Sequence, residues 1–212
     1  MLDFYLIRHG QTQSNIWKTF QGWSDTSLTE LGIQQGKDVA LRLKNENIIG
    51  LFSSTSERAY DIAYFINAYH ELPINMTKGL KEMNFGLLET HREIMSRWQD
   101  LLMLDWTKFE GENLEHLQNR MRKTMDAIAD SYQNKSGVVV CVTHSFSILS
   151  FIRSIDKEVF QLCLDQDVKI NNCSVNKFQW NEGQWSIKTI NEVEIDGYLS
   201  NVKLKRSEEH TS

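Results

Sequence analysis

Residues 3–10 have the sequence DFYLIRHG, in which four apolar or aromatic side chains lead into an arginine, a histidine and a glycine. A second apolar run, VVVCV at residues 138–142, passes through a threonine to His144. A short, continuous apolar run is typical of a strand buried on both faces of a sheet. The two runs therefore predict two central strands, each followed at its carboxyl end by a histidine.

Helical patterns alternate with these strands. Apolar side chains recur at helical spacing in residues 57–69 and 112–132, and a helix is also expected at about residues 30–44. Residues 174–180 and 184–190 alternate around a turn and predict a hairpin. Strands that alternate with helices predict a three-layer α/β/α fold, in which helices cover both faces of a mostly parallel central sheet.

The chain is expected to form a single domain over residues 1–212, because no stretch rich in proline or glycine divides it. A helical lid insertion is expected at about residues 87–110, with its helix at about 93–106. Most apolar side chains of this lid are expected to pack in the core, and a few to line the mouth of the site, which would suit a substrate with an apolar or aromatic portion. A polar tail from about residue 203 is expected to fray.

The segment after the first strand is harder to assign. Residues 11–26 are polar with three aromatic side chains, and we expect them to form mostly loop. Ser27 and Glu30 have the spacing of a capping box at the start of the following helix, and Thr29 is a rival N-cap.

Composition limits the partners and the location of the protein. A formal net charge of -5 argues against nucleic-acid binding, which needs a dominant basic surface. No apolar run reaches the length of about 20 residues that a membrane span needs, and the N-terminus lacks the pattern of a signal peptide. Three unpaired cysteines fit a reducing compartment. We therefore expect a cytoplasmic protein without a membrane partner.

Four residues are expected to meet at one edge of the sheet. Arg8, His9 and His144 stand at strand ends, and Arg58 lies at the helix start that follows a strand at residues 51–53. Ligands bind beyond the carboxyl ends of parallel strands. Two guanidinium groups would neutralise a phosphoryl dianion, and a neutral imidazole is a competent nucleophile.

Several of these features also have a structural explanation. A single histidine after a strand is more often a hydrogen-bonded structural residue than a catalyst, and the other four histidines stand on helical or polar stretches, so we assign them no role.

Gly10 would let the backbone approach a ligand closely. The carboxylate spacing of a magnesium site is absent, so we expect no metal ion and no cofactor.

Residues 8–15 have the sequence RHGQTQSN. This stretch matches the RHGxTxxN signature of the histidine phosphatase superfamily, which includes the cofactor-dependent phosphoglycerate mutases, and the sequence resembles that family. Stretches similar to later motifs of the family follow in the family's order. They are QGWSD at 21–25, whose last four residues form the GWSD element, LTELG at 28–32, SSxxxRA at 53–59, LKEMNFG at 80–86, GE at 111–112 and NCS at 172–174. Departures from the family pattern include Ile62, Thr90, Asn113 and Ser145.

The resemblance implies a phosphoglycerate mutase-like fold and a role for each matching residue. His9 would be the phosphorylated nucleophile, Arg8, Arg58 and His144 would form the phosphate pocket, and Glu82 would be the general acid and base. We place further substrate contacts at the residues Gly10, Asn15, Gln21, Gly22 and Ser145.

The segment after Gly86 is short and lacks the basic pair that grips a carboxylate in the mutases. We therefore expect a metal-independent phosphatase acting on a small phosphorylated substrate. Phosphoglycerate mutase-type transfer and a non-catalytic phosphate-binding module are the alternatives. A homodimer is compatible with the resemblance, because dimers are common among related proteins.

Overall fold

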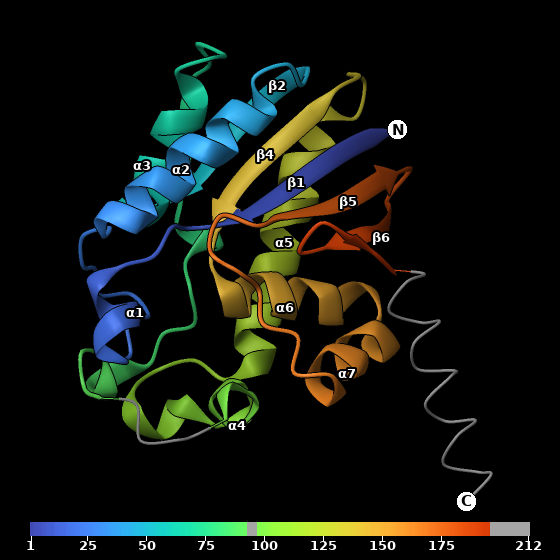
Figure 1. Ribbon diagram of the computed structural model, residues 1–212. Helices are drawn as coiled ribbons and strands as arrows, with labels where there is room; N and C mark the ends of the chain where they lie inside the picture. Colours follow the sequence, from blue (N-terminus) through green and yellow to red (C-terminus); the bar gives the residue numbers. More distant parts are fainter. Residues whose placement is uncertain (93–96, 196–212) are drawn as a thin grey trace, which may run out of the picture.

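The fold is an α/β arrangement around one central sheet, seen in a computed structural model that describes residues 1–92 and 97–195 (Figure 1). Within the described residues the sheet has seven strands in the order β3-β2-β4-β1-β5-β6-β7. The strands are β1 (Leu2–Arg8), β2 (Ile48–Ser54), β3 (Ile74–Thr77), β4 (Val138–Thr143), β5 (Val175–Asn181), β6 (Gln184–Ile190) and β7 (Val193–Glu194). Strands β3, β2, β4 and β1 run parallel, and β5 to β7 continue the sheet antiparallel.

Helices cover both faces of this sheet, as predicted (Figure 1). The α-helices are α1 (Gln13–Trp17), α2 (Glu30–Leu43), α3 (Glu57–Asn67), α4 (Trp98–Met103), α5 (Leu114–Tyr132), α6 (Ser145–Ile155) and α7 (Lys157–Asp165). The described residues also contain three short 3₁₀ helices, η1 (Lys78–Leu80), η2 (Gly86–Leu88) and η3 (Trp106–Phe109). The expected hairpin is confirmed as the antiparallel pair β5 and β6.

Two hydrophobic cores result from the alternation of side chains along the strands. Ile7 and Val140 face α2 and α3, whereas Leu6 and Val139 face α5 and α6. Every residue of β4 is buried. The continuous apolar runs are therefore explained by a sheet that needs apolar side chains on both faces.

The N-terminal segment is more regular than its polar composition indicates. The loop predicted over residues 11–26 contains α1, which begins with a reciprocal capping box between Thr12 and Asn15. Of the two caps considered for α2, Thr29 is the N-cap, and its hydroxyl accepts the N–H of Gly32 at 3.0 Å. The predicted box of Ser27 and Glu30 is wrong, because the helix begins two residues later than it requires.

Within the described part of the helix expected at about residues 93–106, the structure has α4. Residues 93–96 and the tail from about residue 203 lie outside the described residues. In the described part of the chain, no helix is both long and apolar enough to cross a membrane.

Candidate active site

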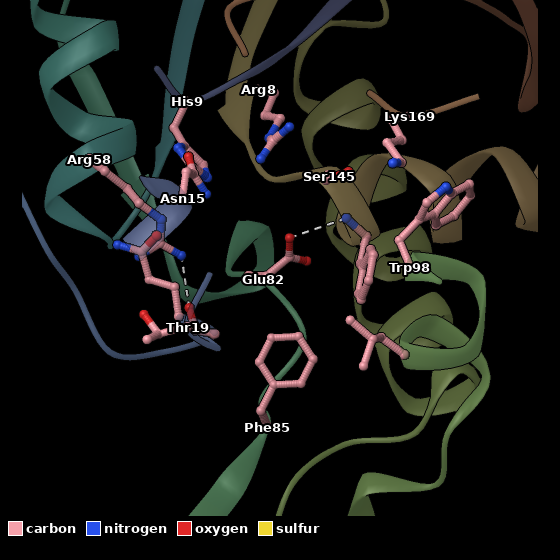
Figure 2. A pocket seen from close by; sticks show the side chains of 14 residues that line it. Arg8, His9, Asn15, Thr19, Arg58, Glu82, Phe85, Trp98, Ser145 and Lys169 are labelled. Atoms are coloured by element: carbon pink, nitrogen blue, oxygen red, sulfur yellow. Dashed lines mark hydrogen bonds between the residues drawn. The ribbon is translucent and has the colours of Figure 1, made fainter. Parts of the chain in front are cut away.

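One cavity of about 190 Å³ opens where the parallel strands end (Figure 2). All the residues predicted for the site line this cavity except Gly10 and His144. These side chains come from segments far apart in the chain, because the carboxyl ends of β1, β2 and β4 share one edge of the sheet.

His9 presents one ring nitrogen to the cavity. Its backbone N–H donates to the carbonyl of Thr143 at 3.0 Å, which ties the end of β1 to β4. Its Nδ1 lies 2.7 Å from the carbonyl oxygen of Gly10, and this contact assigns the proton to Nδ1 and the lone pair to Nε2. Burial, followed by the charges of Arg58 and Arg8, holds the pKa of His9 well below its usual value. The imidazole is therefore neutral and nucleophilic at neutral pH.

His144 lies behind His9, with their ring centroids 5.2 Å apart. Its Nδ1 accepts a hydrogen bond from Nη2 of Arg58 at 3.1 Å, so its proton is on Nε2, which donates to the hydroxyl of Ser54 at 2.9 Å. Burial and the charge of Arg58 hold the pKa of His144 well below its usual value. His144 is fully buried, and in this arrangement it supports Arg58 rather than facing the cavity.

Arg58 is held rigidly in the first turn of α3. Its guanidinium forms an ion pair with Asp25 at 2.7 Å and donates to the carbonyls of Gly22 and Ser24 at 2.8 Å each. Its side chain is 1% exposed. Among the described residues, its buried Nε is left without a hydrogen-bond partner, although buried donors are nearly always paired.

Arg8 lies on the side of His9 that faces away from Arg58 (Figure 2). Its Nη1 donates to the carbonyl of Ile170 at 2.6 Å, in the segment between α7 and β5. The same segment contributes Asn172, whose amide donates to the carbonyl of His9 at 2.9 Å. The chain before β5 therefore positions both residues.

Glu82 sits at the N-terminus of α6. Its carboxylate accepts the N–H groups of Met83 at 2.9 Å and of Phe146 and Ser147 at 3.1 Å each. Burial raises the pKa of Glu82, and these N–H groups and the two arginines oppose that effect. A carboxyl with a raised pKa is suited to exchange protons with a substrate. Helix α6 begins at Ser145, so the N–H groups of Phe146 and Ser147 lie in its first turn, where they have no partner within the helix.

Asn15 and Gln21 line the cavity, but each amide also has a structural task. The Oδ1 of Asn15 accepts the N–H of Thr12 at 3.1 Å. Gln21 accepts from the Thr12 hydroxyl at 3.0 Å and donates to Thr26 at 2.9 Å. Ser145 lines the cavity at the first residue of α6.

The two predicted glycines are explained by packing. A Cβ on Gly10 would lie 2.5 Å from the carbonyl oxygen of Gly32, so Gly10 allows α2 to approach, and it does not line the cavity. Gly22 does line the cavity; its φ of +46° and the nearby carboxylate of Glu89 both exclude a side chain.

Six residues lining the cavity were not predicted as site residues. Trp98 and Leu101 belong to the expected lid, from which a few unspecified side chains were expected at the mouth, and the others are Thr19, Phe85, Phe146 and Lys169. Asp25, the partner of Arg58, was not predicted either. Neither Phe146 nor Lys169 stands at a strand end, so strand position was no guide to them. Asp25 lies within the quoted GWSD element, which was a usable signal. In the parts of the chain that the structure describes, no group of three or more histidine, cysteine, aspartate or glutamate side chains could hold a metal ion.

Comparison with known proteins identifies the family. Residues 4–193 match the sequence profile of the histidine phosphatase superfamily (branch 1). The chain is 29% identical over 193 residues to the probable phosphoglycerate mutase GpmB of Escherichia coli O1:K1, covering 87% of this chain and 88% of the relative.

Solved structures share the fold. A phosphoglycerate mutase from Bacillus anthracis superposes with a TM-score of 0.79 at 23% identity, covering 95% of this chain and 96% of that one. A phosphoserine phosphatase from Entamoeba histolytica, in complex with 3-phosphoglyceric acid, gives a TM-score of 0.74 at 25% identity, covering 91% and 98%. With two buried histidines and two arginines at the edge of this sheet, the chain belongs to the histidine phosphatase superfamily.

Proposed function

We propose that the protein is a phosphatase that hydrolyses small phosphomonoesters through a phosphohistidine on His9, without a metal ion. The observation that carries the proposal is the meeting of His9 Nε2, the guanidinium groups of Arg8 and Arg58, and the carboxyl of Glu82 around one cavity. A nucleophile, charge stabilisation and a proton donor are the parts that phosphoryl transfer requires.

The first step transfers the phosphoryl group to the enzyme. The lone pair of His9 Nε2 attacks phosphorus, and the bond between phosphorus and the ester oxygen breaks. Glu82 in its protonated form donates its proton to that oxygen, so the alcohol leaves neutral. Arg8 and Arg58 offset the charge of the phosphoryl oxygens while the group moves.

The second step hydrolyses the phosphohistidine. Glu82, now a carboxylate, takes a proton from a water molecule as the water oxygen attacks phosphorus. The bond between Nε2 and phosphorus breaks, phosphate is released, and Glu82 is again protonated. The hydrogen bond from Nδ1 to the Gly10 carbonyl holds the ring in the same orientation through both steps.

The test is release of phosphate from p-nitrophenyl phosphate, with and without a chelator. We expect activity that the chelator does not change and that His9→Ala abolishes, together with an acid-labile phosphoryl label on the wild-type protein only. Activity lost to the chelator would contradict the metal-free scheme. A wild-type protein that binds phosphate but turns nothing over would instead be a phosphate-binding module.

A mutase is the second candidate, and the identity to a probable phosphoglycerate mutase favours it. A mutase must return the phosphoryl group from His9 to a second acceptor hydroxyl instead of to water. Assaying interconversion of phosphoglycerates alongside their hydrolysis separates the two functions. We expect hydrolysis to be the faster reaction, and interconversion that outpaces hydrolysis would overturn the proposal.

A further inference from the structure

The wall of the cavity away from His9 and Arg58 is aromatic (Figure 2). The ring of Phe146 lies 6.5 Å from that of Trp98 and 6.1 Å from that of Phe85, centroid to centroid. Trp98 and Phe146 are only partly buried, although both rings are large and apolar. This wall therefore offers aromatic surface to whatever lies beyond the phosphoryl group.

A single carboxylate outside the cavity holds Trp98, one of the three rings of this wall. The Oδ1 of Asp167 accepts the indole N–H of Trp98 at 2.5 Å and the amide N–H of Gln99 at 2.9 Å. Asp167 lies between α7 and β5, the segment whose Ile170 carbonyl accepts from Arg8. One short segment thus contacts both the aromatic wall and an arginine of the phosphate pocket.

The lysine charge at the rim of the cavity is partly offset by a neighbouring carboxylate. Lys169 lines the cavity, and its Nζ lies 3.9 Å from the second carboxylate oxygen of Asp167. Both side chains are largely exposed, at 62% and 63%. The carboxylate therefore partly offsets the lysine charge that would otherwise attract an anionic substituent.

We propose that Asp167 is a positioning residue that holds Trp98 against the cavity, so that the site selects phosphomonoesters whose organic group is aromatic. The substrate class rests on the proposed function, because the phosphoryl group must lie beside His9 for the organic group to reach this wall. The indole is fixed in advance by its hydrogen bond, so less conformational freedom is lost when a planar group packs on it.

The test measures binding rather than turnover. Benzylphosphonate and methylphosphonate share a non-hydrolysable phosphonate and differ in the aromatic ring, and calorimetry gives the Kd of each for the full-length protein. We expect benzylphosphonate to bind about tenfold more tightly, as burial of part of one ring surface would give. Equal affinities would overturn the inference.

Variants separate the role of Asp167 from general damage. Asp167→Ala and Trp98→Phe each remove one side of the hydrogen bond, and each should reduce the benzyl preference about threefold, as loss of one such bond would give. The double variant should reduce it no further, because the two side chains act through one contact. Asp165→Ala is the matched control, since Asp165 pairs with Gln161 on α7, and it should keep the full preference. An equal loss of affinity for both phosphonates in Asp167→Ala would overturn the positioning role.

Turnover distinguishes this inference from the proposed function. Benzyl phosphate and ethyl phosphate both release a primary alcohol, so their kcat/KM ratio reports mainly the contact with the organic group. We expect the ratio to favour benzyl phosphate in the wild type and to fall in Asp167→Ala. If neither ester is hydrolysed, the phosphatase proposal fails, while the phosphonate affinities still decide whether the aromatic subsite exists.

Discussion

At the residue scale, one cavity shifts the pKa values of two groups in opposite directions. Burial and two arginines hold the pKa of His9 low, and burial raises the pKa of Glu82. The same desolvation acts on both groups, but it disfavours a cation in one case and an anion in the other. The result is a neutral imidazole beside a carboxyl that keeps its proton more readily, which is the pairing that nucleophilic attack with proton donation needs.

The role of Glu82 predicts an effect that depends on the leaving group. Glu82→Gln should lower kcat/KM for an alkyl phosphate by about 10²–10⁴-fold, because the alkoxide cannot leave without a proton. For p-nitrophenyl phosphate the loss should be far smaller, because p-nitrophenolate leaves unprotonated. Steady-state kinetics on both esters measures the difference.

The control for this prediction is a check that Glu82→Gln still folds normally. Three backbone N–H groups donate to the Glu82 carboxylate, and a glutamine offers them one carbonyl oxygen. Thermal unfolding of Glu82→Gln therefore accompanies the kinetics. Equal losses on both esters in a variant that folds normally would show that Glu82 does not protonate the leaving oxygen.

At the element scale, the segment after β1 is held in place by close backbone contact with α2. A Cβ on Gly32 would lie 2.1 Å from the carbonyl oxygen of Gln11, and a Cβ on Gly10 would meet the carbonyl of Gly32. The Thr29 N–H also donates to the Gln11 carbonyl at 2.9 Å. This contact fixes the turn that carries His9, so the start of α2 belongs to the support of the site.

This contact predicts that Gly32→Ala destabilises the protein by about 1–3 kcal/mol, the usual cost of overpacking. Gly36→Ala in the same helix is the matched control. A Cβ there would meet side-chain atoms of Ile62 and Phe65, which can shift more easily than the backbone carbonyl that a Cβ on Gly32 meets, and the higher helix propensity of alanine offsets part of the crowding. Urea unfolding of both variants measures the difference, and a Gly32→Ala variant as stable as Gly36→Ala would contradict the close contact.

At the scale of the whole molecule, two histidines are buried as neutral groups where the sheet ends. His144 is fully buried and His9 is 4% exposed, and both have a pKa well below the usual value. In the unfolded chain each would bind a proton near its ordinary pKa. The unfolded state therefore binds more protons than the folded state below about pH 6.5, and acid favours unfolding.

This linkage predicts that the free energy of unfolding falls as the pH drops below about 6.5, by up to about 1.4 kcal/mol per pH unit for each histidine. Glu82 acts in the opposite direction. Its raised pKa penalises the folded state at higher pH, and that penalty disappears as the pH falls through the folded pKa towards the ordinary value. Urea unfolding without phosphate at pH 7 and pH 5.5 measures the net slope.

Histidine variants assign that slope. His144→Asn should lower it, because the variant has no imidazole at this position for the unfolded state to protonate. His116→Asn, at an exposed position on α5, should leave it unchanged. If both variants keep the wild-type slope, the acid sensitivity comes from groups other than His144.

The sequence alone determined the two central strands, the helices on both faces of the sheet, and the histidines and arginines that meet at its edge. Apolar runs and helical periods depend on neighbours a few positions away, and the order of strands and helices limits how a sheet can form. The family motif added Glu82, which stands on a loop and has no signal of its own in the strand pattern.

Only the tertiary structure decided how these side chains are held. The partners of Arg58 at Asp25 and of Trp98 at Asp167 are 33 and 69 residues away along the chain, and nothing in a local pattern specifies such pairs. Gly10 was expected to face a ligand and instead packs against α2, because the direction of a turn is set by what packs on it. Periodicity places a residue on an element, but long-range packing sets where its side chain points and what its pKa becomes.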